Sequence, residues 1–384
     1  AARSGPSGAE GGPPPSGGVA GLLLKRDAGM RLEQQVGQML RLLELLVWED
    51  QQLQELLARE GLTLQDVRVT YAIAMTGPNT AIVEYVEGAK TLRDVREGRG
   101  RHGPSKAPLS QRFLAPADRS TLISHLRQHN SSRDLPLALA RLACTSAVSA
   151  VLSFVAGLGD RHHENFMATA DGRLLHVDYG YALGREPLDS MLIHMLSGGR
   201  PATLLQYEEL MEALGPSLLK HVFWPTVRRA YHCVRRQAGL LTELVFAAIT
   251  RDPSHRNPRG DAAASQRAWA TAQAFVTRRC VPSMAEPAAE QFIEMLLRHC
   301  ARNEAGARLR DGLKGLNLRE KAQQGVSRMC DVMFQQGRGA SSAVGLAAQE
   351  STAAASGVAV GLFRGVRALL AESGATDEEE HTHD

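Results

Sequence analysis

The residues with the clearest chemical potential lie between Gly157 and Gly184, in the sequence GLGDRHHENFMATADGRLLHVDYGYALG. Asp160 stands five positions before Asn165, and Asp178 follows Asn165 by thirteen positions within DYG. Transfer of a phosphoryl group needs an acceptor for a proton, oxygen ligands for Mg²⁺ and a cation that contacts the phosphates. Carboxylate and amide oxygens of this kind are ligands that Mg²⁺ accepts. The stretch therefore has the residue types of a phosphoryl-transfer site.

The spacing supports this interpretation. An aspartate five positions before an asparagine is the separation of base and metal ligand in the loop HRDxxxxN. A hairpin is predicted from Phe166 to Thr169 and from Leu174 to Val177, with a turn at Asp171 and Gly172. Its ends would meet and bring Asn165 and Asp178 to one metal ion. The plainer interpretation, in which these residues only cap a helix and form turns, requires two independent spacings to agree by chance.

Other chemistries fit less well. Adjacent histidines point in different directions on a regular backbone, and the group His162, His163, Glu164 and His176 contains no HExxH motif, so zinc is disfavoured. The chain has no GxSxG motif of a serine hydrolase. The sequence GRGRHG (98–103) matches GxGxxG, but a helix-like segment precedes it where a strand is needed.

The segment before this stretch predicts a small β-containing unit. Leu22 to Lys25 is a short apolar strand, and apolar residues recur at helical spacing from Met30 to Leu57. Residues alternate from Val67 to Met75, and the turn GPNT leads into AIVEYV, which indicates a hairpin. A loop rich in glycine, proline and basic residues follows at Arg96–Asp118.

The rest of the chain is predicted to be mainly helical, so the fold class is α+β. The run Leu142–Gly159 is long enough for a membrane span, but its small and hydroxylated residues favour a buried core helix. The predicted helices are Arg119–Gln128, Pro136–Ala156, Leu204–Leu214, Leu218–Phe246, Ser265–Thr277, Ala288–Arg302 and Leu318–Phe334.

Composition excludes some classes. The 384 residues are 43% hydrophobic and 22% charged, with a net charge of +3 and no run of five or six basic residues, so nucleic acid is not an expected partner. Five widely spaced cysteines without CxxC indicate reduced thiols. Residues 1–18 are mostly Gly, Pro, Ser and Ala, which predicts disorder, and residues 377–384 read as an acidic tail.

The sequences GLGDRHHEN and HVDYGYALGREP closely resemble the catalytic and activation loops of the phosphatidylinositol 3-kinase and related-kinase superfamily. The resemblance extends from about Leu22 to at least Phe246. It implies a bilobal, protein-kinase-like fold with a small and incomplete N-lobe and a helical C-lobe. The implied domains are a disordered segment (1–21), the partial N-lobe to the hinge (22–86), the C-lobe (87–346), and a C-terminal helix and tail (347–384).

The resemblance also implies roles for individual residues. Asn165 and Asp178 would bind Mg²⁺ or Mn²⁺, and His162 would be the base, oriented by Asp160. Lys25 would contact the phosphates of ATP and Glu33 would support it, where the family has Asp. The remaining ATP-binding residues would be Tyr71 at the back of the adenine pocket, Val83 as gatekeeper, and the hinge residues Glu84 and Val86 through their backbone.

The activation segment is most similar to class III phosphatidylinositol 3-kinases. Arg185 and Arg200 are its two fixed positive charges between Gly180 and Leu214. Extra head-group phosphates would call for more cationic donors, so unphosphorylated phosphatidylinositol is the expected acceptor, although a short loop says little about substrate. The resemblance further implies regulatory protein subunits and a cytoplasmic location, peripherally bound to endomembranes of the endosome and autophagy pathways.

Two alternatives remain. The two strands and phosphate-covering loop that the family carries before Lys25 are replaced by low-complexity sequence. Either the chain is a fragment of a larger protein or its small lobe is incomplete, and an incomplete lobe favours a pseudokinase scaffold. A Ser/Thr kinase of the related-kinase branch is the other alternative. Apolar residues at helical spacing from Val358 to Leu370 predict a helix that either lies in a membrane interface or packs on the core.

Overall fold

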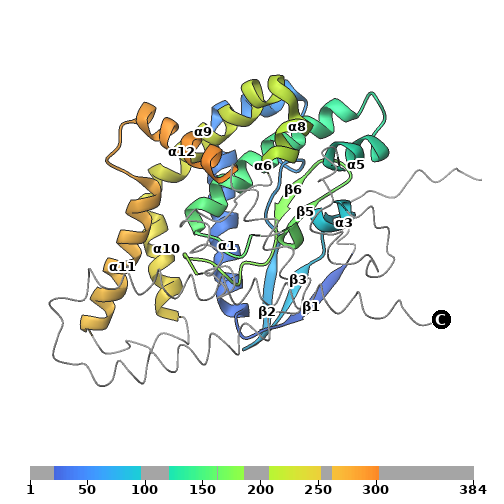
Figure 1. Cartoon of the computed structure of the whole chain (residues 1–384). Helices are drawn as coiled ribbons and strands as arrows, with labels where there is room; N and C mark the ends of the chain where they lie inside the picture. The colour runs from blue at the N-terminus through green and yellow to red at the C-terminus, as the bar shows by residue number, and fades with distance from the viewer. Residues whose placement is uncertain (1–20, 97–120, 162, 186–206, 252–261, 302–384) are drawn as a thin grey trace, which may run out of the picture.

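The computed structural model describes residues 21–96, 121–161, 163–185, 207–251 and 262–301. These residues form the predicted α+β fold, with small sheets beside a larger helical part (Figure 1). His162, Arg200, the GRGRHG loop and the helices predicted at 318–334 and 358–370 lie outside the described residues. The proposed domain boundaries stay predictions.

The first sheet carries the predicted phosphate-contacting lysine. Its antiparallel strands β1 (Leu22–Arg26), β2 (Ile73–Gly77) and β3 (Thr80–Glu84) lie in the order β1-β3-β2. Lys25 pairs with Ala81, at the start of β3. Because β3 lies in the middle, β1 is an edge strand, and its three leucines are exposed.

The strand predicted from Val67 begins later, at Ile73. The reason is a side chain from a helix: Glu44 accepts hydrogen bonds from the Val69 amide and the Thr70 hydroxyl. A backbone amide that a carboxylate satisfies has no need of a neighbouring strand. Residues 68–72 therefore lie outside the strand, and of them the Ala72 carbonyl accepts from the Glu84 amide of β3 at 2.9 Å.

The helix predicted over Met30–Leu57 is two helices, α1 (Met30–Trp48) and α2 (Gln51–Glu60). Asp50 breaks the helix, with φ −70° and ψ 124°, and its carboxylate accepts from the Leu53 amide at 3.4 Å. The same carboxylate accepts from Arg229 at 2.7 Å and 2.6 Å. Since the arginine comes from a distant helix, apolar spacing alone could not show the break.

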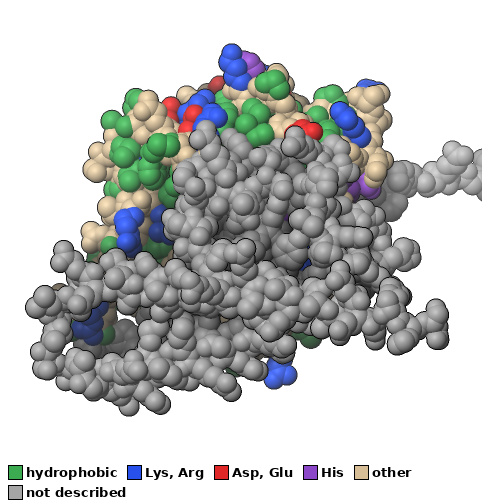
Figure 2. All heavy atoms as spheres, viewed as in Figure 1, with side chains coloured by type: hydrophobic (Ala, Val, Ile, Leu, Met, Phe, Trp, Pro, Cys, Tyr) green, Lys and Arg blue, Asp and Glu red, His purple; other side chains and the backbone are tan. Residues whose placement is uncertain are grey.

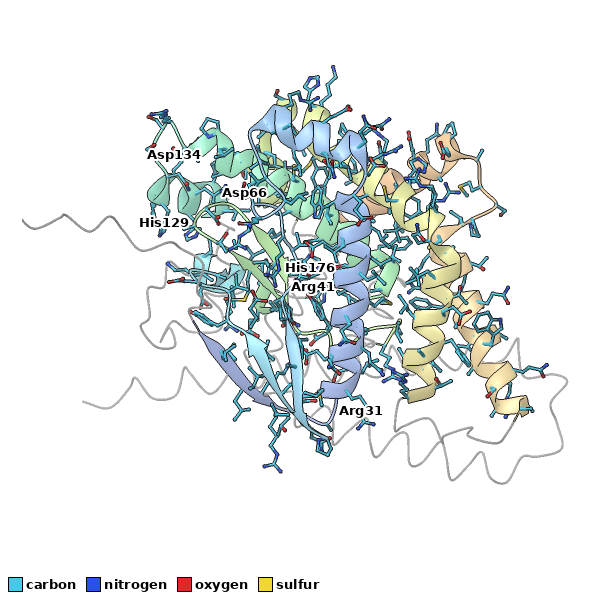
Figure 3. The ribbon with its side chains drawn as sticks, turned by 180° about the vertical axis from the view of Figure 1, so that it is seen from behind. Arg31, Arg41, Asp66, His129, Asp134 and His176 are labelled. Atoms are coloured by element: carbon cyan, nitrogen blue, oxygen red, sulfur yellow. The ribbon has the colours of Figure 1, made fainter. Side chains whose placement is uncertain are left out.

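The second sheet contains the predicted hairpin. Strands β5 (Phe166–Ala168) and β6 (Leu174–His176) pair as expected, and the short β4 (Lys90–Thr91) joins them in the order β4-β5-β6. The helix α3 (Leu92–Arg96) follows β4. Arg141 anchors the turn by donating to the Asp171 carbonyl and, at 2.8 Å, to Asp66. In Figure 3 Asp66 lies in the upper part of the view, whereas Arg31, near the start of α1, lies at the lower end.

In the described helical part, one of the predicted helices is interrupted. The single helix predicted over Leu218–Phe246 is a π-helical turn, η2 (Leu219–Phe223), followed by two helices, with Pro225 in the first turn of α9 and the second break at Gln237 (φ −98°, ψ 18°). Proline has no amide to donate, so it suits the start of a helix. The helices are α5 (Thr121–His129), α6 (Leu135–Ala156), α8 (Tyr207–Leu218), α9 (Trp224–Arg236), α10 (Ala238–Arg251), α11 (Ala262–Cys280) and α12 (Glu286–Ala301).

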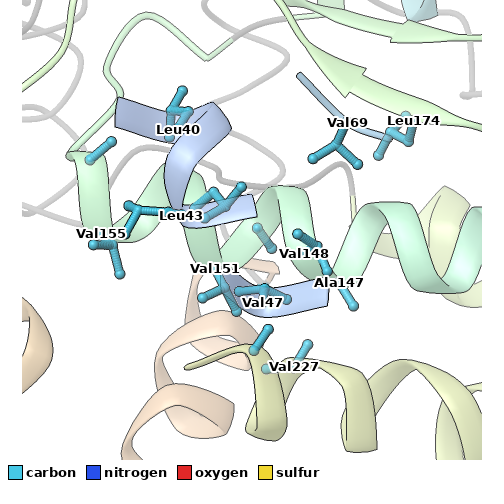
Figure 4. Packing of buried hydrophobic residues seen from close by; sticks show 14 of the residues in the cluster. Leu40, Leu43, Val47, Val69, Ala147, Val148, Val151, Val155, Leu174 and Val227 are labelled. Carbon is cyan, nitrogen blue, oxygen red and sulfur yellow. The ribbon is translucent and has the colours of Figure 1, made fainter. Parts of the chain in front are cut away.

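The core forms around α6. This helix is long and apolar enough to cross a membrane, but 89% of its most apolar 18-residue window is buried inside the fold. Helices α1 and α9 pack against it. Figure 4 shows these contacts among side chains that include Leu43 and Val47 of α1, Val148 and Val151 of α6, and Val227 of α9. The prediction of a buried core helix is confirmed.

The described surface has a mixed character. On the face in Figure 2, the visible Lys and Arg side chains of the described residues are separated by apolar, acidic and uncharged ones. Such a mixture agrees with the net charge of +3. This part of the face carries no continuous basic surface of the kind that binds nucleic acid.

Gly172 tests the packing of the hairpin on α6. It has φ +97°, and a Cβ there would stand 2.1 Å from the Ala138 carbonyl oxygen. We expect Gly172→Ala to lower the free energy of unfolding by about 3 kcal/mol, because strain and overlap add. Gly239 in α10 has open space around it, so Gly239→Ala should be neutral or stabilise by about 1 kcal/mol. Urea unfolding compares the two, and equal effects would contradict the packing described.

Candidate active site

A lysine and two carboxylates meet between β1, α1 and the DYG sequence. Lys25 Nζ lies 2.8 Å from Glu33 Oε2 and 3.6 Å from Asp178 Oδ1. Burial lowers the pKa of Lys25, but the hydrogen bond and charge of Glu33 outweigh burial and raise it above its usual value. Burial raises the pKa of Glu33. The structure thus brings together the cation, its predicted support and one predicted metal ligand.

Tyr71 joins these groups from the segment before β2. Its hydroxyl accepts from the Asp178 amide at 3.2 Å and donates to Glu33 Oε1 at 3.5 Å. Its ring stacks on that of Tyr179, with centroids 5.1 Å apart. Burial raises the pKa of both tyrosines. The Tyr71 hydroxyl thus links the backbone of the DYG sequence to Glu33.

Arg161 fastens the catalytic loop to the DYG segment from inside. Its side chain is fully buried. It donates to the carbonyls of Gly159 at 2.7 Å, Val177 at 3.0 Å and Asp178 at 2.5 Å. Burial lowers its pKa, whereas the charges of Asp160 and Asp178 act in the opposite sense. Sequence reasoning gave Arg161 no role, although it lies within the DRH sequence that carried the resemblance.

The ends of the hairpin meet as the spacing predicted. The Val177 amide donates to the Asn165 carbonyl at 3.1 Å, which places Asn165 beside the residue that precedes Asp178. Asn165 Nδ2 donates to the Asp160 carbonyl at 2.8 Å. Asp160 and Asp178 both have left-handed backbone, with φ 53° and 60°. A non-glycine residue in this region is uncommon, and such strain concentrates at functional sites.

Asn165 and Asp178 fit a magnesium ion that also binds phosphate. Because the Asn165 amide nitrogen is used, its amide oxygen is the atom for a cation, and the Asp178 side chain is 47% exposed. Among the described residues, no three His, Cys, Asp or Glu side chains form a group that could hold a metal by themselves. Two oxygen ligands completed by phosphates and water are typical of Mg²⁺.

An ion pair missed by sequence reasoning supports the catalytic loop from the side. Arg93 of α3 pairs with Glu164 in the short helix η1 (His163–Asn165). The predicted hinge leads into β4 and α3, so this pair connects the segment after it to the turn that carries Asn165. No spacing along the chain links positions 71 residues apart.

The predicted hinge residues lie at the end of β3. Val83 is buried on that strand, and Val86 packs partly against the core. The Glu84 carboxylate accepts from the Ala72 amide at 2.8 Å and from Arg68, which fixes its side chain. The roles predicted for Glu84 and Val86 belong to backbone atoms, and these contacts with adenine stay predictions.

The remaining predicted residues are separated from this centre or outside it. Arg185 ends the described part of the activation segment, where its amide donates to the Ala182 carbonyl at 3.2 Å. His176, considered above as a zinc ligand, is buried in β6 and hydrogen bonds to Ser153 of α6. Figure 3 shows it within the body of the protein. Burial lowers its pKa and keeps its ring neutral, so His176 has a structural position.

The chain is similar to lipid kinases over this whole region. Residues 20–254 match the family "Phosphatidylinositol 3- and 4-kinase". A Glycine max protein, the nodule isoform of phosphatidylinositol 3-kinase, is 23% identical over 60% of this chain and 24% of its own length. The Caenorhabditis elegans phosphatidylinositol 3-kinase catalytic subunit type 3 is 24% identical over 52% of this chain and 20% of its own.

A third relative is the mouse phosphatidylinositol 3-kinase C2 domain-containing subunit gamma, 28% identical over 49% of this chain and 12% of its own length. The chain therefore spans a quarter or less of the length of these relatives. The matched region contains both sheets, α1 and the hairpin, so the likeness covers every residue of the site described above.

Tyr71 tests the network behind the lysine. In Tyr71→Phe the Asp178 amide loses its acceptor, and an unsatisfied buried group costs about 1–3 kcal/mol. We expect a loss of that size in the free energy of unfolding. Tyr85→Phe is the control, because Tyr85 is 40% exposed. A Tyr71→Phe protein as stable as the parent would show that the hydroxyl is not needed.

Proposed function

The chain belongs to the phosphatidylinositol 3- and 4-kinase family, and from this premise we propose that it transfers the γ-phosphoryl group of ATP to the 3-hydroxyl of phosphatidylinositol. The observation that carries the proposal is the position of Lys25, bound to Glu33 and 3.6 Å from Asp178. The proposed phosphate-binding cation and one proposed metal ligand thus lie side by side. The similar regions of three phosphatidylinositol 3-kinases support the choice of lipid substrate.

In phosphoryl transfer, a protein contributes mainly by positioning the reactants and by stabilising charge. Lys25 would contact the phosphates, and Glu33 keeps its side chain directed there. Asn165 and Asp178 would hold Mg²⁺, which when bound supplies charge neutralisation for the transferring group. Arg161 and Tyr71 hold the backbone of Asp178 in place. The chain's own part is therefore to keep one cation and two oxygen ligands at fixed separations.

In the proposed step, the inositol 3-oxygen forms a bond to the γ-phosphorus while the bond from that phosphorus to the β,γ-bridging oxygen breaks. The hydroxyl proton passes to His162, and ADP leaves. Asp160 would orient His162, which stands two positions after it. A neutral imidazole accepts a proton readily near neutral pH.

The acceptor proposed is unphosphorylated phosphatidylinositol. Arg185 and Arg200 are the fixed positive charges between Gly180 and Leu214, and a phosphorylated head group would call for more donors of this kind. We extend the proposal to binding at the surface of endomembranes, with regulatory protein subunits.

A pseudokinase is the second candidate, and β1 favours it. Within the described residues β1 pairs with β3 alone, and Leu22 and Leu24 are 64% and 78% exposed. A further strand on that edge would continue the sheet beyond β1. A scaffold would bind nucleotide weakly or not at all, so a thermal shift on addition of ATP and Mg²⁺ separates this candidate from the kinase.

The first prediction from the proposed function concerns Asp178, the proposed metal ligand. Asp178→Ala should lower lipid phosphorylation about a thousandfold, because metal-assisted charge stabilisation contributes several kcal/mol. Circular dichroism should show an unchanged fold. The control is Glu55→Ala, since Glu55 is an exposed carboxylate on α2 that contacts Gln51. Comparable turnover in Asp178→Ala and the parent would refute the assignment.

The second prediction concerns the substrate. With labelled ATP, Mg²⁺ and mixed vesicles, the label should enter phosphatidylinositol at the 3-position in preference to phosphatidylinositol 4,5-bisphosphate. The physical reason is the low number of fixed positive charges in the activation segment, where Arg185 and Arg200 are the two arginines between Gly180 and Leu214. Chromatography of the deacylated products identifies the position. Preferential labelling of the bisphosphate, of the 4-position or of a protein would rule out this substrate.

A further inference from the structure

Arg279 contacts the site from a helix that lies outside the region of family similarity. It stands near the end of α11 (Ala262–Cys280), whereas the family match ends at residue 254. Its Nε donates to the Phe154 carbonyl at 3.1 Å, and its guanidinium carbon lies 3.8 Å from the centre of the Phe275 ring. The side chain therefore reaches the end of α6, where the catalytic loop begins.

Beneath Arg279 the catalytic loop and the activation segment run side by side. Three backbone hydrogen bonds join them: Gly159 N to Tyr181 O at 2.7 Å, Leu183 N to Ala156 O at 2.9 Å, and Gly184 N to Gly157 O at 2.9 Å. In this paired segment, residues 156–159 end immediately before Asp160, and residues 181–184 begin three positions after Asp178. Its register therefore sets the spacing of the two aspartates.

The guanidinium lies directly on the backbone of this paired segment. A Cβ on Gly157 would stand 2.8 Å from Arg279 Nη2 and 3.0 Å from Phe275 Cζ. Gly184 is close as well, since its Cβ would lie 3.7 Å from Arg279 Nη2. Both glycines have left-handed backbone, with φ +57° and +81°. Arg279 is thus held between an aromatic ring and two glycines from the two functional loops.

Electrostatics favour a cation in this place. The Phe154 carbonyl belongs to the last turn of α6, the negative end of the helix dipole. Burial, with a smaller contribution from Arg278, lowers the pKa of Arg279 to about 10, so the side chain remains charged at neutral pH. The Tyr231 hydroxyl donates to the Arg279 carbonyl at 2.6 Å and fixes the end of α11 to α9.

We propose that Arg279 is a positioning residue for phosphoryl transfer, which holds residues 156–159 and 181–184 in register and thereby sets Asp160 against Asp178. The inference rests on the proposed function. It assigns to α11 a part in the reaction that the family similarity does not cover. Lys25 and the predicted hinge, the proposed contacts to phosphate and adenine, lie on other elements, so we expect loss of Arg279 to act on the reacting geometry more than on nucleotide binding.

The test compares Arg279→Met with Arg278→Met on the full chain. Arg278 is the exposed neighbour on the same helix, so its loss controls for charge and helix propensity. We expect Arg279→Met to lower kcat about tenfold or more, as for the loss of a hydrogen bond from a charged group. KM for ATP should stay unchanged, and Arg279→Lys should recover part of kcat.

Hydrogen exchange supplies a readout that does not depend on activity. The amides of Leu183 and Gly184 are donors in the paired segment, so both should exchange about tenfold faster in Arg279→Met, and at the parent rate in Arg278→Met. Faster exchange together with no lipid phosphorylation by the parent would support the contact and refute the proposed function. If Arg279→Met does not fold, Arg279→Lys replaces it in the test. The amides of Leu183 and Gly184 should then exchange at a rate between that of the parent and that of a fully open backbone.

Three results would overturn the inference. One is a parent-like kcat in Arg279→Met when the parent phosphorylates lipid. Another is unchanged exchange at Leu183 and Gly184, in Arg279→Met or, if that protein is unfolded, in Arg279→Lys. The third is a rise in KM for ATP with unchanged kcat, because it would assign Arg279 to nucleotide binding.

Discussion

A fully buried guanidinium, that of Arg161, is the interaction on which the site depends. Removing an arginine from water is costly unless every donor finds an acceptor. Here three carbonyls, of Gly159, Val177 and Asp178, accept from it. These carbonyls come from both loops of the site, so one side chain determines how the loops lie together. The left-handed backbone of Asp160 and Asp178 costs energy, and this arginine, with the hydrogen bond from Asn165 to the Asp160 carbonyl, helps to offset it.

Helix α1 connects that centre to the small sheet. Glu33 holds Lys25, and eleven residues further along Glu44 holds the amide of Val69. Between them Gly37 lies against the small sheet and the DYG segment. A Cβ there would stand 3.2 Å from Ile73 and 3.6 Å from the Tyr179 ring. The absence of a side chain lets the helix approach both, so a shift of α1 would move the lysine, the sheet and the DYG segment together.

Local signals in the sequence predicted the local parts of this arrangement. Alternating residues and the Asp171-Gly172 turn were enough for the hairpin, and with it for the approach of Asn165 to Asp178. Family resemblance was needed to pair Lys25 with Glu33, since a separation of eight residues across a turn does not determine a distance. The features that the sequence did not predict depend on residues that are far apart in the chain. The break at Asp50 depends on Arg229, and the late start of β2 depends on Glu44. The contact of Arg279 with Phe154 joins positions 125 residues apart, and periodicity carries no trace of it.

The two glycines under Arg279 have a consequence for how this chain can change over evolutionary time. A side chain at position 157 would meet a guanidinium, a ring and a backbone amide at once. An alanine there would require neighbours to shift, because its Cβ would stand 2.8 Å from both Arg279 Nη2 and the Gly184 amide nitrogen and 3.0 Å from Phe275 Cζ. Substitutions at positions 157, 184, 275 and 279 should therefore be coupled, so that related sequences keep all four residues or replace them together.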